Sequence, residues 1–463
     1  MPEDKKVLAV YDFASKQEYI YRTPKIKEIS GASDILKGIY KQFAEWLAAE
    51  GVSVLKAADF TADFTEDAQI LYEGGGTLTV LFRDKDTYSR ANKIISRRLL
   101  TEYPGLSPVT ACAEYTGDFT ADRTKLFGEA MTRFKNLSPA YDLPAVTPFT
   151  QIDPLTFLPI VYKGKRYTAE AESFSADRVA KQEAFIASKV PDDLNEGKIA
   201  VIHIDGNSMG KKVKALGGKS YAESVKHLRE FSRKVNTVFV EDTQTAIKSA
   251  LGEGAPFRFV IAGGDDLTVI CRAEDALKVT YAYFDSLCAS GSVMPDKVKF
   301  DGDPNNTACA GIVVAHAKTP FALLYDLAEE ACESAKERAH TENGNYLDFH
   351  YCHEGVTADL ETLREQEKTP SARPYSVTEW ETLTDKYAPV LRAAGRANVK
   401  ALLNAAQESE SAFAFEVERV NAYLATQKKT DERLTADPNT MNTVCDMAEF
   451  YDLWFAKKGG KKE

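Results

Sequence analysis

One order of elements occurs twice in this sequence, and the repetition limits the fold more than any other feature. In each copy an apolar strand ends in an aspartate, a long amphipathic helix follows, and two strands flank a Gly-Gly turn. A helix, a strand and another helix complete the copy. The aspartates are Asp12 and Asp205 and the turns begin at Gly74 and Gly263, so the copies are offset by about 190 residues. We interpret this as an internal duplication of one α+β domain, although any two α/β segments can be aligned in a similar way.

The length of 463 residues fits about three domains. We predict a first repeat over 1–140 and a second over 196–355, joined by a Pro- and Thr-rich connector over 141–195 that lacks cysteines. Residues 356–463 have helical periodicity and end in a basic tail, which predicts a small helical C-terminal domain.

Composition excludes several classes of protein. No stretch of about 18 apolar residues occurs and the first residues lack a secretory signal, so we expect a cytoplasmic protein without a membrane partner. The net charge of −11 argues against a general nucleic-acid coat protein. No two of the seven cysteines have C-x-x-C spacing, so no zinc is expected.

The second Gly-Gly turn carries two carboxylates. Gly263 and Gly264 permit a tight hairpin, which would hold Asp265 and Asp266 at its tip. Adjacent carboxylates repel each other unless a cation compensates them. Asp and Gly are also ordinary turn residues, so the motif alone leaves both interpretations open.

A second strand end makes the metal-site interpretation the stronger one. Asp205 ends an apolar strand and precedes a Gly-Asn-Ser-Met-Gly loop. If the two strands are neighbours, Asp205 converges with Asp265 and Asp266. Three such carboxylates predict a two-metal nucleotidyl-transfer site, with Mg²⁺ or Mn²⁺ as the cofactor and a nucleoside triphosphate as the substrate.

Nearby basic residues are ambiguous from sequence alone. Lys336 lies near the end of a helix, where it could reach phosphate or face solvent. Lys211, Lys212 and Lys214 follow the loop and could likewise attract phosphate or form a solvated face. His203 alternates with apolar neighbours and is expected to be a core residue.

These motifs resemble the Palm-domain large subunit of type III CRISPR effector complexes, the cyclic-oligoadenylate polymerase family. The resemblance covers about residues 5–355. It implies two tandem ferredoxin-like Palm domains of the nucleotide cyclase and polymerase type, the first one degenerate and the second one catalytic. The segments that carry it are YDFASKQEYIY and IKEISGASDIL in the first copy, and DGNSMG and GGDD in the second.

The resemblance implies roles for individual residues. Asp205, Asp265 and Asp266 would be catalytic and would hold the metals. The helix that contains Lys336 is similar to one in GGDEF diguanylate cyclases, where a lysine contacts phosphate. The nucleotide-binding residues expected on this basis are Gly206, Asn207, Ser208, Met209, Gly210, Gly263, Gly264, Lys336, Ser15, Gly31 and Ser33.

The chain also departs from the family pattern. The first Palm stands at the N-terminus without an HD nuclease domain, the connector lacks zinc-binding cysteines, and Asn207-Ser208 replaces a common Asp-Asn. We therefore expect either a subunit of a CRISPR effector complex with guide and target RNA, or a stand-alone relative whose cyclic product is read by a downstream effector.

The turn Gly74-Gly75-Gly76-Thr77 of the first copy has no carboxylate. We predict that the first Palm binds the acceptor ATP and the second binds the donor ATP, producing a cyclic oligoadenylate second messenger in antiviral defence. A cyclic di- or mononucleotide synthase, a CRISPR scaffold subunit and an ATP sensor without turnover remain as alternatives.

Overall fold

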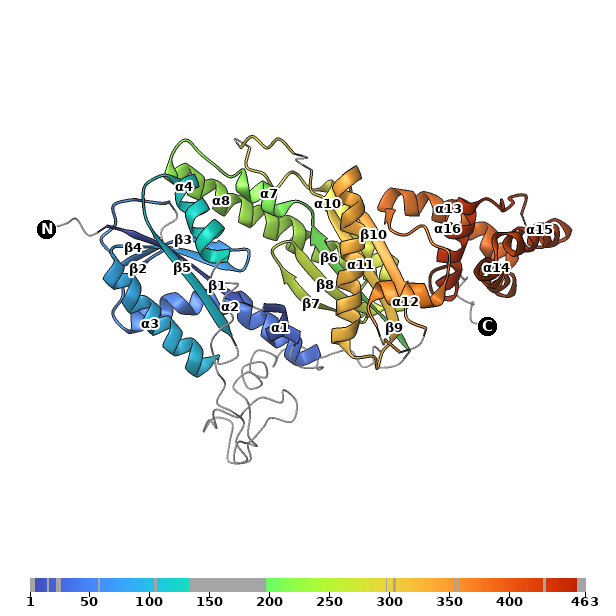
Figure 1. Ribbon diagram of the computed structural model, residues 1–463, viewed down its shortest axis with the longest axis horizontal. Coiled ribbons are helices and arrows are strands. Elements are labelled where there is room, and N and C mark those ends of the chain that lie inside the picture. The colour runs from blue at the N-terminus through green and yellow to red at the C-terminus, as the bar shows by residue number, and fades with distance from the viewer. Residues whose placement is uncertain are drawn as a thin grey trace, which may run out of the picture.

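The computed structural model shows two β-sheets side by side, with a group of helices beyond the second sheet (Figure 1). The described residues are 5–14, 16–21, 26–56, 59–103, 106–132, 197–296, 298–302, 305–353, 355–356, 358–427 and 430–455. The predicted connector over 141–195 and the basic tail lie outside them. Within the described part of the chain, no helix has the length and apolarity needed to cross a bilayer.

The first sheet has the strand order β2-β3-β4-β1-β5. Its strands are β1 (Val7–Ala14), β2 (Val54–Leu55), β3 (Ala68–Gly74), β4 (Thr77–Phe82) and β5 (Ser107–Glu114). The accompanying helices are α1 (Lys16–Tyr21), α2 (Ile26–Ala49), α3 (Lys85–Glu102), α4 (Phe119–Thr124) and the π-helical η1 (Lys125–Ala130). The amphipathic α2 buries Ile39 and Phe43 in the same core as Ala9 and Tyr11 of β1, which fixes the helix on one face of the sheet.

The second sheet has the order β11-β10-β9-β6-β8-β7. Its strands are β6 (Lys198–Gly206), β7 (Phe257–Gly263), β8 (Asp266–Arg272), β9 (Ala308–His316), β10 (Tyr346–Tyr351) and β11 (Tyr375–Ser376). The helices are α7 (Met209–Lys214), α8 (Tyr221–Val235), η4 (Asn236–Asp242), α9 (Thr243–Leu251), η5 (Ala273–Asp275), α10 (Ala276–Ala289) and α11 (Phe321–Glu342).

The predicted duplication is confirmed by strand order and register. The order β3-β4-β1-β5 of the first sheet matches β7-β8-β6-β9 of the second, with antiparallel pairing throughout. The pairing next to the two aspartates also corresponds. Tyr11, which precedes Asp12, pairs with Leu78, and Ile204, which precedes Asp205, pairs with Leu267. Even the register shift in β3 recurs in β7. Two tandem palm domains account for this correspondence.

The two palms pack reciprocally, since α2 of the first contacts β7 of the second and α8 of the second contacts β3 of the first. Arg229 of α8 donates hydrogen bonds to the carbonyl oxygens of Leu71 (2.7 Å) and Ile70 (3.0 Å) in β3. These carbonyls lie at the register shift, where the regular ladder leaves acceptors available. The reciprocal contacts bring the two Gly-Gly hairpins into one interface.

The remaining helices are α12 (Leu360–Glu367), α13 (Val377–Ala394), α14 (Arg396–Glu408), α15 (Glu410–Thr426), α16 (Pro438–Glu449) and η6 (Tyr451–Phe455). Their apolar faces continue the core of the second palm. Polar contacts reinforce the joint: Arg364 pairs with Asp348 of β10 at 2.6 Å, and Arg373 donates a hydrogen bond to the carbonyl oxygen of Phe349 in β10 at 2.6 Å. The helical region is therefore attached to the second palm by both apolar packing and charge.

Candidate active site

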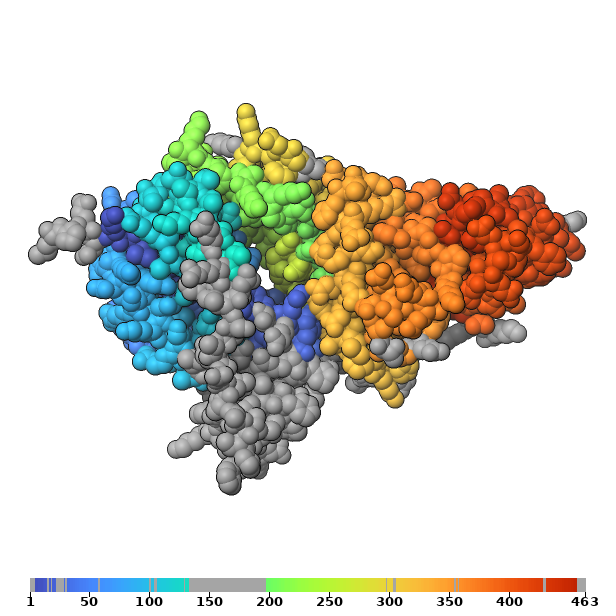
Figure 2. Space-filling view, viewed as in Figure 1, coloured from blue at the N-terminus to red at the C-terminus, as the bar shows by residue number. Residues whose placement is uncertain are grey.

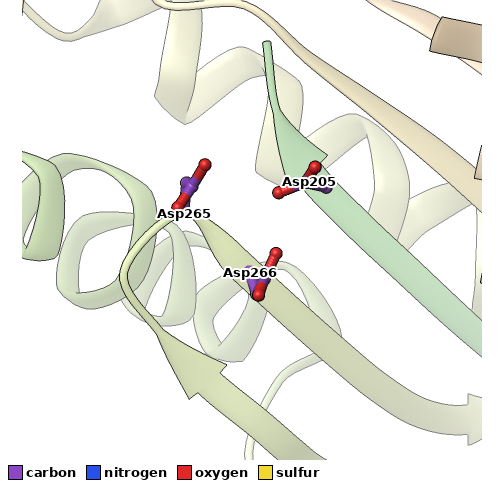
Figure 3. Close-up of side chains that lie close together, drawn as sticks. All are labelled: Asp205, Asp265 and Asp266. Atoms are coloured by element: carbon purple, nitrogen blue, oxygen red, sulfur yellow. The ribbon is translucent and has the colours of Figure 1, made fainter. Parts of the chain in front are cut away.

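Three aspartates meet at one end of the second sheet (Figure 3). Asp205 is the second-to-last residue of β6, and Asp266 is the first residue of the neighbouring strand β8. Asp265 lies in the hairpin turn between β7 and β8. One carboxylate oxygen from each side chain lies within 4.8 Å of the other two. The structure thus brings together the three carboxylates that the sequence predicted would converge.

Glycines make the close approach sterically feasible. A Cβ atom at Gly206 would lie 2.8 Å from the Cβ of Asp265 and 2.9 Å from the Cε of Met209, so a side chain at this position would push the loop away from the hairpin. Gly264 has a φ of +67°, which allows the tight turn. The glycines on both sides of the site therefore set the separation between the carboxylates.

Burial and mutual repulsion shift the acidity of the cluster. Desolvation and the charge of Asp205 raise the pKa of Asp265 to about 7. Desolvation and a hydrogen bond shared with Asp205 raise the pKa of Asp266 well above its usual value. For Asp205 the cost of desolvation is outweighed by this hydrogen bond and by Lys336, so its pKa is lowered. Ionisation of all three carboxylates is therefore opposed unless positive charge lies nearby.

Lys336 supplies one such charge. Its Nζ lies 2.5 Å from a carboxylate oxygen of Asp205 and 2.5 Å from Glu333. Desolvation opposes the charged form of Lys336, but the hydrogen bond and charge of Asp205 raise its pKa overall. Lys336, for which the sequence left a phosphate contact and a solvent-facing position open, therefore lies at the carboxylate cluster, paired with Asp205.

The loop after β6, residues 207–210, is held in place by a side-chain hydrogen bond of Asn207. Asn207 donates from its side chain to the carbonyl of Gly344 at 3.0 Å. Ser208 adopts the left-handed conformation with φ of +59°, and Met209 and Gly210 begin α7. Asn207 thus anchors the loop to the segment before β10, and its amide is committed to that contact.

Other predicted residues have different environments. Lys212 does not belong to a solvated face. Its side chain is buried and donates a hydrogen bond to the carbonyl oxygen of Asn305 at 2.8 Å. His203 is buried, as expected, and desolvation lowers its pKa to about 4. Gly31 and Ser33 lie inside α2, both buried, and Ser15 lies outside the described residues.

The first palm has a lysine where the second palm has its carboxylate cluster. Register aligns Gly76 and Thr77 with Asp265 and Asp266. Asp12 is kept and buried, but the Nζ of Lys16 lies 2.5 Å from its carboxylate and donates to the carbonyl of Gly76 at 2.9 Å. Tyr40 donates to the same carbonyl at 2.7 Å. An ammonium group therefore stands between the elements that in the second palm carry the three carboxylates. Sequence reasoning missed Lys16, whose one signal is its spacing of four residues from Asp12.

Beside the hairpin of the first palm is a cavity of about 250 Å³. It is lined by hairpin residues, by α4 and η1, and by α8 of the second palm. Its lining includes Tyr72, Gly74, Thr77, Arg123 and Phe127. The Arg123 guanidinium lies 5.3 Å from the centre of the Phe127 ring. Figure 2 shows a hollow on the molecular surface where the two palms meet.

Comparison with known proteins agrees with this geometry. The family model for the second palm domain of Cas10/Cmr2 matches residues 198–344. The fold is similar to that of Csm1 from T. onnurineus, with a TM-score of 0.57 at 14% identity over 96% of this chain and 70% of that chain. An apo Csm1–Csm4 cassette gives a TM-score of 0.58 at 14% identity over 97% and 70%, and a Csm1–Csm4 cassette in complex with cA4 gives 0.56 at 14% over 96% and 70%. No curated protein matches the sequence.

Proposed function

We propose that this chain, a Cas10-like palm-domain protein, is a nucleotidyltransferase that makes a cyclic oligoadenylate from ATP as a second messenger in antiviral defence. The observation that carries the proposal is the convergence of Asp205, Asp265 and Asp266 at one end of the second sheet. Csm1–Csm4 cassettes of similar fold have been solved with one ATP and with cA4. We extend this nucleotide chemistry to the present chain.

The donor set fits divalent cations. Carboxylate oxygens are the ligands that Mg²⁺ and Mn²⁺ prefer, and the raised pKa values of Asp265 and Asp266 indicate a site short of positive charge. Asp205, Asp265 and Asp266 would hold the cations. Bound metals would lower the pKa of the attacking hydroxyl group and stabilise the pyrophosphate leaving group.

The second palm would bind the donor ATP. The loop from Gly206 to Gly210 and the hairpin glycines Gly263 and Gly264 would border its phosphates, since glycine backbone admits a close approach. Lys336 neutralises Asp205 at 2.5 Å. With a cation held by Asp205, the ammonium group of Lys336 would be available to contact phosphate as a point charge.

The first palm would bind the acceptor ATP. Its cavity lies beside the hairpin on the side of Thr77, which occupies the position of Asp266 in the second palm. Arg123 and aromatic side chains in the lining offer a cation and π-faces to a nucleotide. Positioning the acceptor hydroxyl against the donor α-phosphate would then provide most of the acceleration. Ser15, Gly31 and Ser33 stay predictions as nucleotide-binding residues.

We further propose the domain limits 1–140, 141–195, 196–355 and 356–463 for the first palm, connector, second palm and helical domain. The solved relatives include Csm1 bound to Csm4, which supports a role within a type III CRISPR effector complex with guide and target RNA. A stand-alone synthase is the alternative assembly.

The deciding experiment offers each nucleoside triphosphate with Mg²⁺ or Mn²⁺ to the purified chain and identifies products by mass spectrometry. The control is the double variant Asp265→Ala, Asp266→Ala. A cyclic adenylate made by the wild type and lost in the variant supports the proposal. A product that persists in the variant contradicts the site assignment. If no product forms with or without added RNA and Csm4-type partners, the chain is a scaffold or an ATP sensor.

A further inference from the structure

The catalytic carboxylates belong to a row of side chains on one face of the second sheet. Gly263 of β7 and Asp266 of β8 are cross-strand partners, so their Cβ directions point to the same face. Asp205 of β6 follows Ile204, whose partner is Leu267, and therefore lies beside Asp266 on that face. The row continues on the far side of Asp205 with Lys336 from α11.

The near end of the row is empty of side chain in the second palm itself, because the residue there is Gly263. The space is approached by the first palm. Lys37 of α2 places its Cε atom 3.7 Å from where a Cβ of Gly263 would lie. Gly263 is the cross-strand partner of Asp266, so the Lys37 side chain ends beside the strand position that neighbours Asp266. One lysine of the first palm therefore lies at the hairpin glycine, and one lysine of the second palm lies at Asp205.

The state of Lys37 differs from that of the other lysines at the site. Lys336 is held at 2.5 Å by both Asp205 and Glu333, and buried Lys212 is bound to a backbone carbonyl. Lys37 has 44% of its side chain exposed, and its ion pair with Asp34 is long, at 3.7 Å. An exposed pair of this length contributes little energy, so Lys37 can turn to a ligand at small cost.

The equivalent position in the first palm is occupied differently. Gly74 corresponds to Gly263, and there the helix α8 of the second palm presents the hydroxyl of Ser232. Both hairpins are thus approached at the same glycine by the opposite palm. The amine faces the hairpin with carboxylates, where a metal-bound triphosphate would bring negative charge. The hydroxyl faces the hairpin that lacks them.

We infer that Lys37 is a phosphate-binding residue which the first palm contributes to the second palm's site, where it contacts the β- or γ-phosphate of the nucleotide at the Gly-Gly-Asp-Asp hairpin. The inference rests on the proposed nucleotide chemistry of that site. The carboxylates come from the second palm, and Lys37 would be a phosphate ligand from the first.

The test compares Lys37→Met, Lys37→Arg and, as a matched control one turn along α2, Lys41→Met in the full chain. Binding of ATP and of AMP is measured by calorimetry in the presence of Mg²⁺. AMP lacks the β- and γ-phosphates, so it reports a merely structural effect. We expect Lys37→Met to weaken ATP binding about tenfold or more while AMP binding stays within twofold. Lys37→Arg should restore most of the ATP affinity, and Lys41→Met should behave as the wild type.

The inference is overturned if Lys37→Met binds ATP as the wild type does, or if it loses ATP and AMP affinity equally. Product formation is followed separately in the same samples. A wild type that binds ATP but makes no product contradicts the proposed synthase and leaves the binding comparison decisive for Lys37. A wild type that binds no ATP overturns both.

Discussion

Substitution of Gly311 by alanine should disturb the candidate site from a distance. Gly311 lies in β9 beneath α11, and a Cβ atom there would be 1.9 Å from the carbonyl oxygen of Ala328 and 2.5 Å from the amide nitrogen of Cys332. Both atoms belong to helix backbone, so no side-chain rotation can relieve the overlap. Ordinary van der Waals contact begins at 3.4 Å. Helix α11 would therefore have to move away from β9 by about 1.5 Å, the difference between 3.4 Å and the 1.9 Å separation from the Ala328 oxygen.

The retreat would carry Lys336, one turn beyond Cys332, away from Asp205. Overpacking of this kind costs about 1–3 kcal/mol, and a misplacement of about 1 Å near reacting groups can lower a rate about 100-fold. We expect Gly311→Ala to lower the free energy of unfolding in urea by this amount and to lower nucleotidyl transfer about 100-fold. The exposed Gly217, with nothing within 4 Å of its Cβ position, supplies the control Gly217→Ala. A Gly311→Ala protein with wild-type stability and rate would refute the reasoning.

Three further outcomes follow from the charges of the molecule. Asp266→Asn removes repulsion within the carboxylate cluster, so it should abolish product formation while keeping or slightly raising the free energy of unfolding; a large loss of stability would contradict this. Mg²⁺ at 100 times its dissociation constant should stabilise the wild type by about 2.7 kcal/mol, and the double variant Asp265→Ala, Asp266→Ala should lose that gain in thermal unfolding. Burial and the nearby Glu449 raise the pKa of Glu367 to about 7, so the folded chain holds a proton that the unfolded chain releases above about pH 4.3. The free energy of unfolding attributable to Glu367 therefore falls as pH rises from about 4.3 to 7. Glu367→Gln should be more stable than the wild type by about 1–3 kcal/mol at pH 8 and equal to it at pH 4, whereas the exposed control Glu365→Gln should track the wild type at both.

The fold could be predicted from sequence because its signals are local. Apolar strands, a Gly-Gly turn between two of them and an amphipathic helix each appear within a short window, and their recurrence indicated the duplication. The register of β7 against β8 then follows from the hairpin that joins them, whereas β6 and β8 pair across more than 60 residues of chain. Convergence of Asp205 with Asp265 and Asp266 depended on that strand adjacency, which the sequence could suggest only as a condition.

The surroundings of the site could not be predicted, because they depend on contacts between segments far apart in the chain. The burial of Lys212 is set by the loop at Asn305, and the anchoring of Asn207 by Gly344. Lys37 reaches the second palm only through the packing of α2 on β7. Sequence patterns show that a lysine is polar and do not show which carboxylate or hairpin it will meet.

The contrast between the two palms leads to a last prediction, on Lys16. Its ammonium group lies between the buried Asp12 and the carbonyl of Gly76, where the second palm has its carboxylate cluster. Lys16→Met should lower the free energy of unfolding by about 2–3 kcal/mol, less than the 3–5 kcal/mol typical of a fully buried pair, because 31% of the Lys16 side chain is exposed.

If the ammonium group substitutes for a metal, a divalent cation should partly restore what Lys16→Met loses. The measurement is thermal unfolding with Mn²⁺ and with a chelator, made in the Asp265→Ala, Asp266→Ala background so that the second palm contributes little. We expect Mn²⁺ to raise the unfolding temperature of the Lys16→Met variant in that background, but not that of the background itself. If Lys16→Met is equally destabilising with and without Mn²⁺, the hairpin of the first palm cannot bind a divalent cation even when Asp12 is unpaired. The absence of carboxylates at Gly76 and Thr77 would then not be compensated by removing the lysine.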